Sequence, residues 1–184
     1  MTDPDAHLPE EIMWEGRFIT TKKRGRWEYV SRARGIRAAV ILAVEDGHVL
    51  LVEQYRVPLG RNCLELPAGL VGDDDGGDGE TAETAASREL EEETGYRARI
   101  IRNCGEFYSS PGMVSESFTL IRASGLEKVG NGGGVAGENI TVHRVALSGL
   151  EAFIEARRAD GAAIDVRLLL FLGAGLLTQA ERTP

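Results

Sequence analysis

Arg88-Glu89-Leu90-Glu91-Glu92-Glu93-Thr94-Gly95-Tyr96 is the stretch that decides how this chain is interpreted. On a helix that advances about 100° per residue, Glu89, Glu92 and Glu93 fall within one arc. Leu90 points elsewhere, toward a core. Like charges at this spacing repel each other, so the three carboxylates are either fully solvated or neutralised by a divalent cation. Carboxylate oxygens favour Mg²⁺ or Mn²⁺ as that cation.

The sequence on either side of this stretch predicts an α+β fold. Good helix formers run through residues 81–94 and stop at Gly95, which predicts a helix. The N-terminal third is rich in β-branched and aromatic residues, and Asp46-Gly47 is a strong hairpin signal. The expected strands are 12–20, 26–33, 38–44, 49–55, 64–67, 99–101, 117–121 and 140–146.

The remainder of the chain adds a glycine loop and two more helices. Residues 131–137 are too glycine-rich for a regular element, and such loops often border sites. Ser148 and Glu151 form a capping-box pattern that opens a helix to about residue 158. Asp165 is expected to cap a final helix through residue 177. We find neither a repeat nor a linker, so one domain over residues 1–184 is predicted.

Composition and charge narrow the class of protein. The chain has 184 residues, of which 42% are hydrophobic and 27% charged, as in an ordinary globular protein. The net charge of −8 argues against binding nucleic acid by bulk electrostatics. Residues 17–37 hold eight Lys or Arg and one Glu, whereas residues 73–93 hold ten Asp or Glu and one Arg. These segments are either two solvated surfaces or parts of a site for metal and phosphate together.

Three features predict a cytoplasmic protein. The longest nearly apolar stretch, residues 168–177, has about half of the ~20 residues that a membrane span needs. The acidic N-terminus lacks the basic start and apolar run of a secretory signal. Cys63 and Cys104 form no Cys-x-x-Cys pair, so we expect reduced thiols.

The glutamate stretch, taken with Leu66-Pro67-Ala68-Gly69 and Glu80, resembles the Nudix box of the Nudix hydrolases. That box reads Gly-x5-Glu-x7-Arg-Glu-aliphatic-x-Glu-Glu-x-Gly-aliphatic, and from Glu80 onward only Tyr96 departs from it. Ten residues instead of five separate Gly69 from Glu80. Either residues 71–79 contain a five-residue insertion, which we favour, or Asp74 occupies the glycine position. The resemblance implies a Nudix-like α/β/α sandwich with a mixed sheet.

The resemblance also implies a site. It places the metal ions on Glu89 and Glu93, with Glu92 nearby and the backbone carbonyl of Ala68 as a further ligand. Glu80 and Arg88 would orient these glutamates. The ions would be Mg²⁺ or Mn²⁺.

Motifs outside the box are similar to the ADP-ribose pyrophosphatase branch of the family. They are residues 52–56, 65–69 and 108–112 with Glu116, and Pro111 follows Tyr96 by fifteen residues, as in that branch. The similarity implies that Arg56 contacts the substrate diphosphate. It implies that Glu138, at the end of the glycine loop, is the general base, with Glu92 or Glu116 as substitutes. The alternative for Glu138 is an exposed loop carboxylate.

The implied activity is hydrolysis of the diphosphate bond of ADP-ribose, or of a related nucleoside diphosphate sugar, to give AMP and ribose 5-phosphate. The alternatives are a hydrolase of GDP-mannose or another nucleotide sugar, and a non-catalytic ligand-binding module. Residues 1–35 would form N-terminal strands that serve a homodimer, as in this branch, and residues 36–184 the catalytic core. Trp27 and Tyr29 alternate on a predicted strand, so they pack in a core or interface, or stack on a purine.

Overall fold

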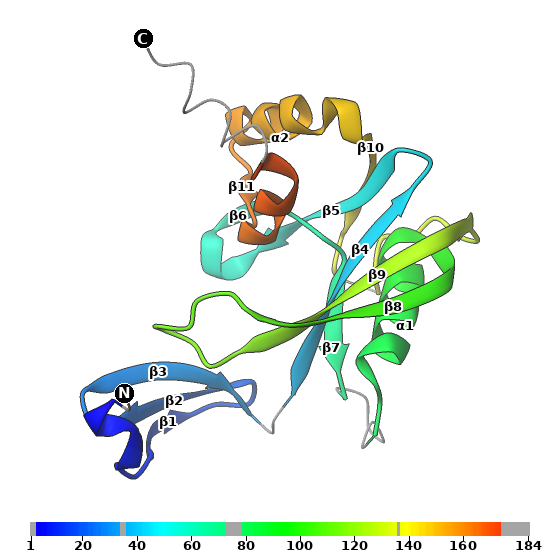
Figure 1. The fold of residues 1–184 in the computed structure, drawn as a ribbon. Helices are drawn as coiled ribbons and strands as arrows, with labels where there is room; N and C mark the ends of the chain where they lie inside the picture. Colours follow the sequence, from blue (N-terminus) through cyan, green and yellow to red (C-terminus); the bar gives the residue numbers. More distant parts are fainter. Residues whose placement is uncertain (1–2, 34–35, 73–78, 136, 174–184) are drawn as a thin grey trace.

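The computed structural model describes residues 3–33, 36–72, 79–135 and 137–173 (Figure 1). Its strands are β1 (Glu11–Glu15), β2 (Ile19–Arg24), β3 (Trp27–Arg32), β4 (Arg37–Glu45), β5 (His48–Arg56), β6 (Arg61–Glu65), β7 (Ala68–Val71), β8 (Tyr96–Tyr108), β9 (Ser117–Lys128), β10 (Thr141–Ala146) and β11 (Ala163–Ile164). The helices are α1 (Ala82–Thr94) and α2 (Leu150–Ala159), and residues 169–173 are helical at the end of the described part. Short 3-10 turns lie at Pro4–His7, Val57–Leu59, Leu147–Gly149 and Val166–Leu168.

The main sheet is mixed. Its order is β11-β6-β5-β4-β9-β8, while β10 pairs with β5 and β7 pairs with β4. Strands β4 and β9 run parallel, as do β11 and β6, and the other pairs of this sheet are antiparallel. A mixed sheet with helices agrees with the predicted α+β class.

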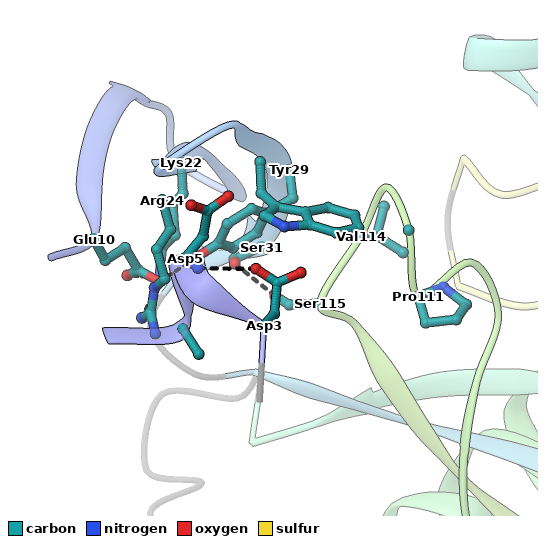
Figure 2. A pocket seen from close by; sticks show the side chains of 13 residues that line it. Asp3, Asp5, Glu10, Lys22, Arg24, Tyr29, Ser31, Pro111, Val114 and Ser115 are labelled. Atoms are coloured by element: carbon teal, nitrogen blue, oxygen red, sulfur yellow. Dashed lines mark hydrogen bonds and ion pairs between the residues drawn. The ribbon is translucent and has the colours of Figure 1, made fainter. Parts of the chain in front are cut away.

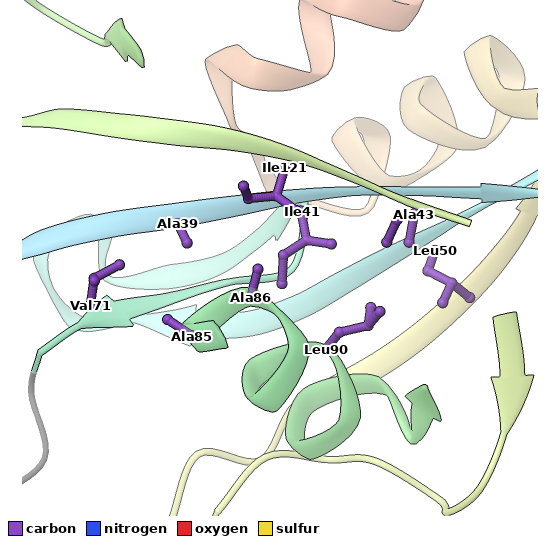
Figure 3. Close-up of a cluster of buried hydrophobic side chains, with 10 residues drawn as sticks. Ala39, Ile41, Ala43, Leu50, Val71, Ala85, Ala86, Leu90 and Ile121 are labelled. Carbon is purple, nitrogen blue, oxygen red and sulfur yellow. The ribbon is translucent and has the colours of Figure 1, made fainter. Parts of the chain in front are cut away.

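Two hydrophobic cores lie on opposite faces of this sheet. Successive side chains of β4 alternate between them: Ala39 and Ile41 face α1, and Val40 faces α2. Leu90 packs from α1 into the first core, as the helical pattern predicts (Figure 3). The second core includes Ile154 of α2. The sheet is therefore enclosed by α1 on one side and α2 on the other (Figure 1), which is the predicted α/β/α sandwich.

Local sequence accounts for the elements nearest the site. Thr81 caps α1 by accepting a hydrogen bond from the Thr84 amide, and Gly95 ends the helix in the left-handed conformation at φ 74°. Asp46 and Gly47 both have positive φ in the turn between β4 and β5, as a two-residue hairpin requires. The predicted helix end at Gly95 and the predicted hairpin at Asp46-Gly47 are confirmed.

The first three strands form a separate antiparallel sheet (Figure 1). One strand over residues 12–20 was the wrong prediction, because the chain turns at Gly16, whose N–H donates to the Ile19 carbonyl at 2.9 Å. This sheet is joined to the core by the 111–115 loop, where the Val30 N–H donates to the Met113 carbonyl and the Ser115 N–H to the Val30 carbonyl.

A cavity of about 500 Å³ lies between this sheet and that loop (Figure 2). The exposed Trp27 and the half-buried Tyr29 line it together with Pro111 and Val114. The Tyr29 hydroxyl donates to the Glu10 carboxylate at 2.5 Å. Because this hydrogen bond stabilises the neutral phenol, it raises the pKa of Tyr29.

Several other boundaries differ from the prediction. Strands β8 and β9 are much longer than the predicted strands 99–101 and 117–121. They pair with each other along the hairpin, and this pairing extends both strands beyond the residues whose own pattern favours a strand. Strands β7 and β11 were not predicted, since both are short and exist through pairing with β4 and β6. Ser148 does not cap α2, whose N-cap is Gly149 without a side-chain bond.

The C-terminal part agrees with the prediction as far as it is described. Asp165 accepts a hydrogen bond from the Arg167 amide at 2.8 Å and caps the turn there. The predicted helix end at residue 177 and most of the 71–79 insertion lie outside the described residues. Both cysteines are free thiols. Among the described helices, none is sufficiently long and apolar to span a membrane.

Candidate active site

A second cavity, of about 600 Å³, lies where β5, β6, β7 and α1 meet, bordered by the loops before β9 and β10 and by the turn after β11. Its lining is unusually rich in charge. The ionisable residues are Arg32, Arg56, Cys63, Glu65, Glu89, Glu93, Glu116, Glu138, Asp165 and Arg167.

Two glutamates of α1 form one wall of this cavity. Glu89 and Glu93 are four residues apart, so they lie on the same face one turn apart. The Glu93 side chain is 4% exposed and accepts one hydrogen bond, at 3.0 Å, from the Ala68 amide. A Cβ on Gly69 would lie 1.9 Å from Cδ of Glu89, so β7 can pass this close only with glycine at that position.

Arg88 fixes the outer side of the glutamate cluster. Its guanidinium pairs with Glu89 at 2.9 Å, with Glu92 at 3.2 Å and with Glu80 at 3.6 Å. Glu80 also accepts from the Gly72 amide at 2.9 Å. Arg88 therefore lies between carboxylates and orients them, in the role that the family resemblance implied.

Glu92 is placed differently from its two neighbours. Its side chain is 39% exposed and contacts Arg88, and Glu92 does not line the 600 Å³ cavity. The helical pattern predicted that all three glutamates share one face of the helix. That face spans an arc of about 100°, and only part of it borders the cavity. The structure brings together the other candidates, namely Arg56, Ala68, Glu89, Glu93 and Glu138.

Arg56 and Glu65 form another wall of the cavity. The Arg56 guanidinium donates two hydrogen bonds to Glu65, at 2.6 and 2.9 Å, from neighbouring antiparallel strands. Glu65 is 4% exposed and therefore holds the guanidinium plane in place. The same pairing raises the pKa of Arg56.

Two further arginines reach this cavity without having been predicted. Arg167 donates two 2.6 Å hydrogen bonds to Asp165, lies 3.5 Å from Glu65 and packs over the Phe118 ring. Arg32 pairs with Glu116. The only sequence signal for Arg167 was a charged residue within an apolar run, and its contacts with β6 and β9 are long-range.

Glu138 comes to the cavity from the glycine loop. Its side chain is exposed, and Oε2 accepts a hydrogen bond from the Val135 amide at 2.9 Å. It is close enough to Glu89 and Glu93 for its charge to contribute to raising the pKa of both.

The carboxylates of this wall are not charge-balanced by the protein alone. Burial, followed by the nearby charges of Glu89 and Glu138, raises the pKa of Glu93 to about 8, although the Ala68 amide opposes the shift. Burial also raises the pKa of Glu89, against the effect of Arg88. Desolvated carboxylates of this kind favour either a proton or a cation.

The residues therefore fit a divalent cation. Hard oxygen donors from Glu89 and Glu93 converge beside the β7 backbone, and a cation would replace the proton that burial favours. Among the described residues, no three His, Cys, Asp or Glu side chains already form a closed metal-binding group.

Comparison with known proteins agrees with this geometry. The NUDIX domain model matches residues 33–150, which include β4 to β10 and α1. The chain belongs to the Nudix family. Nudix hydrolases generally use divalent metal ions, which agrees with the fit of Glu89 and Glu93 to a divalent cation.

Two relatives illustrate the range of similarity within the family. An uncharacterised Nudix hydrolase of Schizosaccharomyces pombe is 36% identical over 82% of this chain and 78% of its own length. The ADP-ribose pyrophosphatase of Bacillus subtilis is 42% identical, but over 48% of this chain and 45% of its own length. This chain thus matches less than half of the latter protein.

A solved structure shares the fold. The crystal structure of an ADP compounds hydrolase superimposes with a TM-score of 0.67 and 23% identity, covering 94% of each chain. At this identity the match shows that the two chains share a fold over the part that superimposes.

The raised pKa of Glu93 predicts a pH-dependent stability in the metal-free protein. Its folded pKa of about 8 lies above the ordinary value of 4.5, so its contribution is full below pH 4.5 and is lost as the pH rises through 8. Relative to Glu93→Gln, the free energy of unfolding of wild type should therefore fall over this interval. Chemical denaturation in chelator at a series of pH values measures it.

Glu91→Gln is the matched control on the same helix, because Glu91 pairs with Arg97 and its pKa is lowered. That variant should keep the wild-type decline between pH 4.5 and 8. Parallel curves for wild type and Glu93→Gln would contradict the assignment of the buried proton.

Proposed function

We propose that this chain hydrolyses the diphosphate bond of ADP-ribose, or of a related nucleoside diphosphate sugar, with Mg²⁺ or Mn²⁺. ADP-ribose would give AMP and ribose 5-phosphate. The observation that carries the proposal is that one cavity is lined by the carboxylates of Glu89 and Glu93 and by the guanidiniums of Arg56 and Arg167. A diphosphate in this cavity would meet both the guanidiniums and a cation held by the glutamates.

Each wall has a distinct task in this reaction. Glu89, Glu93 and the Ala68 carbonyl would hold the divalent ion, which, when bound, neutralises phosphate charge and acidifies the attacking water. Arg56 donates to Glu65 through Nε and Nη2, so its Nη1 would be the nitrogen that donates to a diphosphate oxygen. Glu138 would accept the proton of the water as general base.

The same proposal includes the organisation of the protein. The chain would act in the cytoplasm as one domain, with residues 36–184 as the catalytic core and residues 1–35 serving a homodimer. The apolar side chains of the N-terminal sheet support the dimer. Those with large exposed fractions are Ile12 at 60%, Met13 at 59%, Trp14 at 55%, Phe18 at 55% and Trp27 at 45%. Exposed apolar side chains of this size favour a protein interface.

A substrate panel tests the activity. With Mg²⁺, AMP should be released from ADP-ribose at a higher kcat/KM than products from GDP-mannose, ADP-glucose, NADH or diadenosine polyphosphates. Glu93→Gln should lower turnover by ~10²-fold or more, because charge neutralisation is lost, while Glu91→Gln stays near wild type. Binding of ADP-ribose without turnover would identify a ligand-binding module instead, and near-wild-type activity of Glu93→Gln would reject the metal assignment.

The variants Arg56→Ala and Glu138→Gln should change different kinetic parameters. Glu138→Gln should lower kcat by ~10²- to 10⁴-fold with nearly unchanged substrate binding, because a base acts mainly in the transition state. Arg56→Ala should chiefly raise KM, since its contact is already present in the bound substrate. Steady-state kinetics with ADP-ribose and Mg²⁺ separate the two.

Glu127→Gln and Arg99→Ala are controls for these variants, because they alter an exposed ion pair on β8 and β9. Both should retain wild-type kinetics. Glu92 and Glu116 were the substitutes for the base, and Glu116 lines the cavity whereas Glu92 does not, so an unchanged kcat in Glu138→Gln would move the base to Glu116.

The predicted homodimer is tested by measuring the mass of the native protein in solution. Wild type at micromolar concentration should have twice the mass of the chain, and Trp14→Glu should shift the population toward monomer, because it places a charge in the apolar face. Leu147→Glu, at a side chain 42% exposed in the turn before α2, is the control and should remain dimeric. A fully active wild-type monomer would contradict this part of the proposal.

A further inference from the structure

The glycine loop is attached to the end of α1 by backbone hydrogen bonds. The Gly133 amide donates to the Glu93 carbonyl at 2.8 Å, and the Gly134 amide donates to the Glu92 carbonyl at 3.0 Å. The last carbonyls of a helix have no partner within the helix. The loop therefore caps the turn of α1 that carries the buried Glu93.

This attachment requires the absence of side chains. A Cβ on Gly132 would lie 2.4 Å from the Thr94 carbonyl carbon and 2.6 Å from the Glu93 carbonyl oxygen. Because these obstacles are backbone atoms, they cannot move aside cheaply. The loop reaches α1 only because glycine occupies the point of closest approach.

Gly134, two residues further along the loop, lies close to the Glu138 side chain. It has a φ of +76°, and a Cβ there would lie 2.2 Å from Glu138 Oε2 and 2.9 Å from Ile140 Cδ1. The Val135 amide donates to the same Oε2 at 2.9 Å. The Glu138 carboxylate thus lies in the space that a side chain of residue 134 would occupy.

We infer that Gly134 and the Val135 amide form a cradle that positions the Glu138 carboxylate relative to the glutamates of α1, which makes Gly134 a positioning residue for the reaction. The inference rests on the proposed function, in which Glu138 is the base. Two bonds from the loop to α1 and one from Val135 to Glu138 connect the helix of the carboxylate wall to the base.

The charges of the site show why such a cradle is needed. Glu138 is held near Glu89 and Glu93, and like charges at short range repel each other. An exposed carboxylate on a free loop would move away into water. The cradle opposes that movement through a hydrogen bond to the carboxylate and a pocket without a side chain.

The test compares two glycines of one loop. Gly134→Ala adds a Cβ where Oε2 of Glu138 lies, so the carboxylate must shift. Gly137→Ala places alanine at a φ of +104°, which is at least as unfavourable as that of Gly134, but nothing lies within 4 Å of its Cβ. With the full-length chain, Mg²⁺ and ADP-ribose, Gly134→Ala should lower kcat by roughly tenfold to a hundredfold at unchanged KM. Gly137→Ala should stay within about threefold of wild type.

A double variant separates positioning from a general loss of structure. If Gly134 acts through Glu138, Gly134→Ala should cause no further loss of kcat in a Glu138→Gln background. Gly134→Asn provides a second variant with the same Cβ, because asparagine tolerates positive φ better than alanine does. Circular dichroism and the melting temperature verify that each variant is folded.

The outcomes distinguish the cradle from the proposed function. A wild-type kcat in Glu138→Gln would reject the base assignment, and the cradle with it. If Glu138→Gln loses activity but Gly134→Ala and Gly134→Asn match Gly137→Ala, the cradle alone is overturned. The cradle is equally overturned if Gly134→Ala lowers kcat by the same factor in both backgrounds.

Discussion

Burial of the Glu93 carboxylate between α1 and β7 is the constraint on which the site depends. A carboxylate that is 4% exposed, with a single amide donor, is strongly disfavoured in its charged form unless a cation is near. Its amide donor, Ala68, comes from β7, so strand and helix must approach within hydrogen-bond distance. That approach in turn requires glycine at position 69, because Glu89 occupies the space of its side chain. The affinity of the wall for a positive charge is thus a consequence of how closely two elements pack.

The wall formed by Arg56 and Glu65 likewise depends on a buried carboxylate, here one that is paired with arginine. Glu65 is buried on β6 and accepts two hydrogen bonds from Arg56, with Arg167 3.5 Å away. A guanidinium that is already held by a carboxylate loses less side-chain entropy when an anion binds. The arrangement also sets a requirement for the ligand. An anion must gain more from the guanidiniums than it loses by repulsion from Glu65 and Asp165, which favours a ligand with more than one charge.

The sequence predicted those parts of the structure that depend on neighbouring residues. Helix α1 and the β4–β5 hairpin follow from local caps and turn residues, and the spacing of Glu89 and Glu93 placed both on one helix face. The sequence pattern could not show which distant residues each side chain would contact. Glu92 lies within the predicted arc but contacts Arg88, and Arg167 enters the cavity through contacts with β6 and β9. Strands β7 and β11 likewise exist through pairing with distant strands, so four or fewer residues carried too little local signal.

The glycine-rich segment shows how composition alone can mislead about rigidity. Many glycines predict a loose loop, and at Val135 and Glu138 the segment is indeed exposed. At Gly133 and Gly134, however, the amides are bonded to carbonyls of α1, and Gly132 packs against backbone. Glycine serves here because it allows backbone to contact backbone, which fixes the first half of the loop to the helix that carries the buried glutamates. If Glu138 is the base, we expect its carboxylate to adjust to a substrate while the bonds of Gly133 and Gly134 to α1 stay in place.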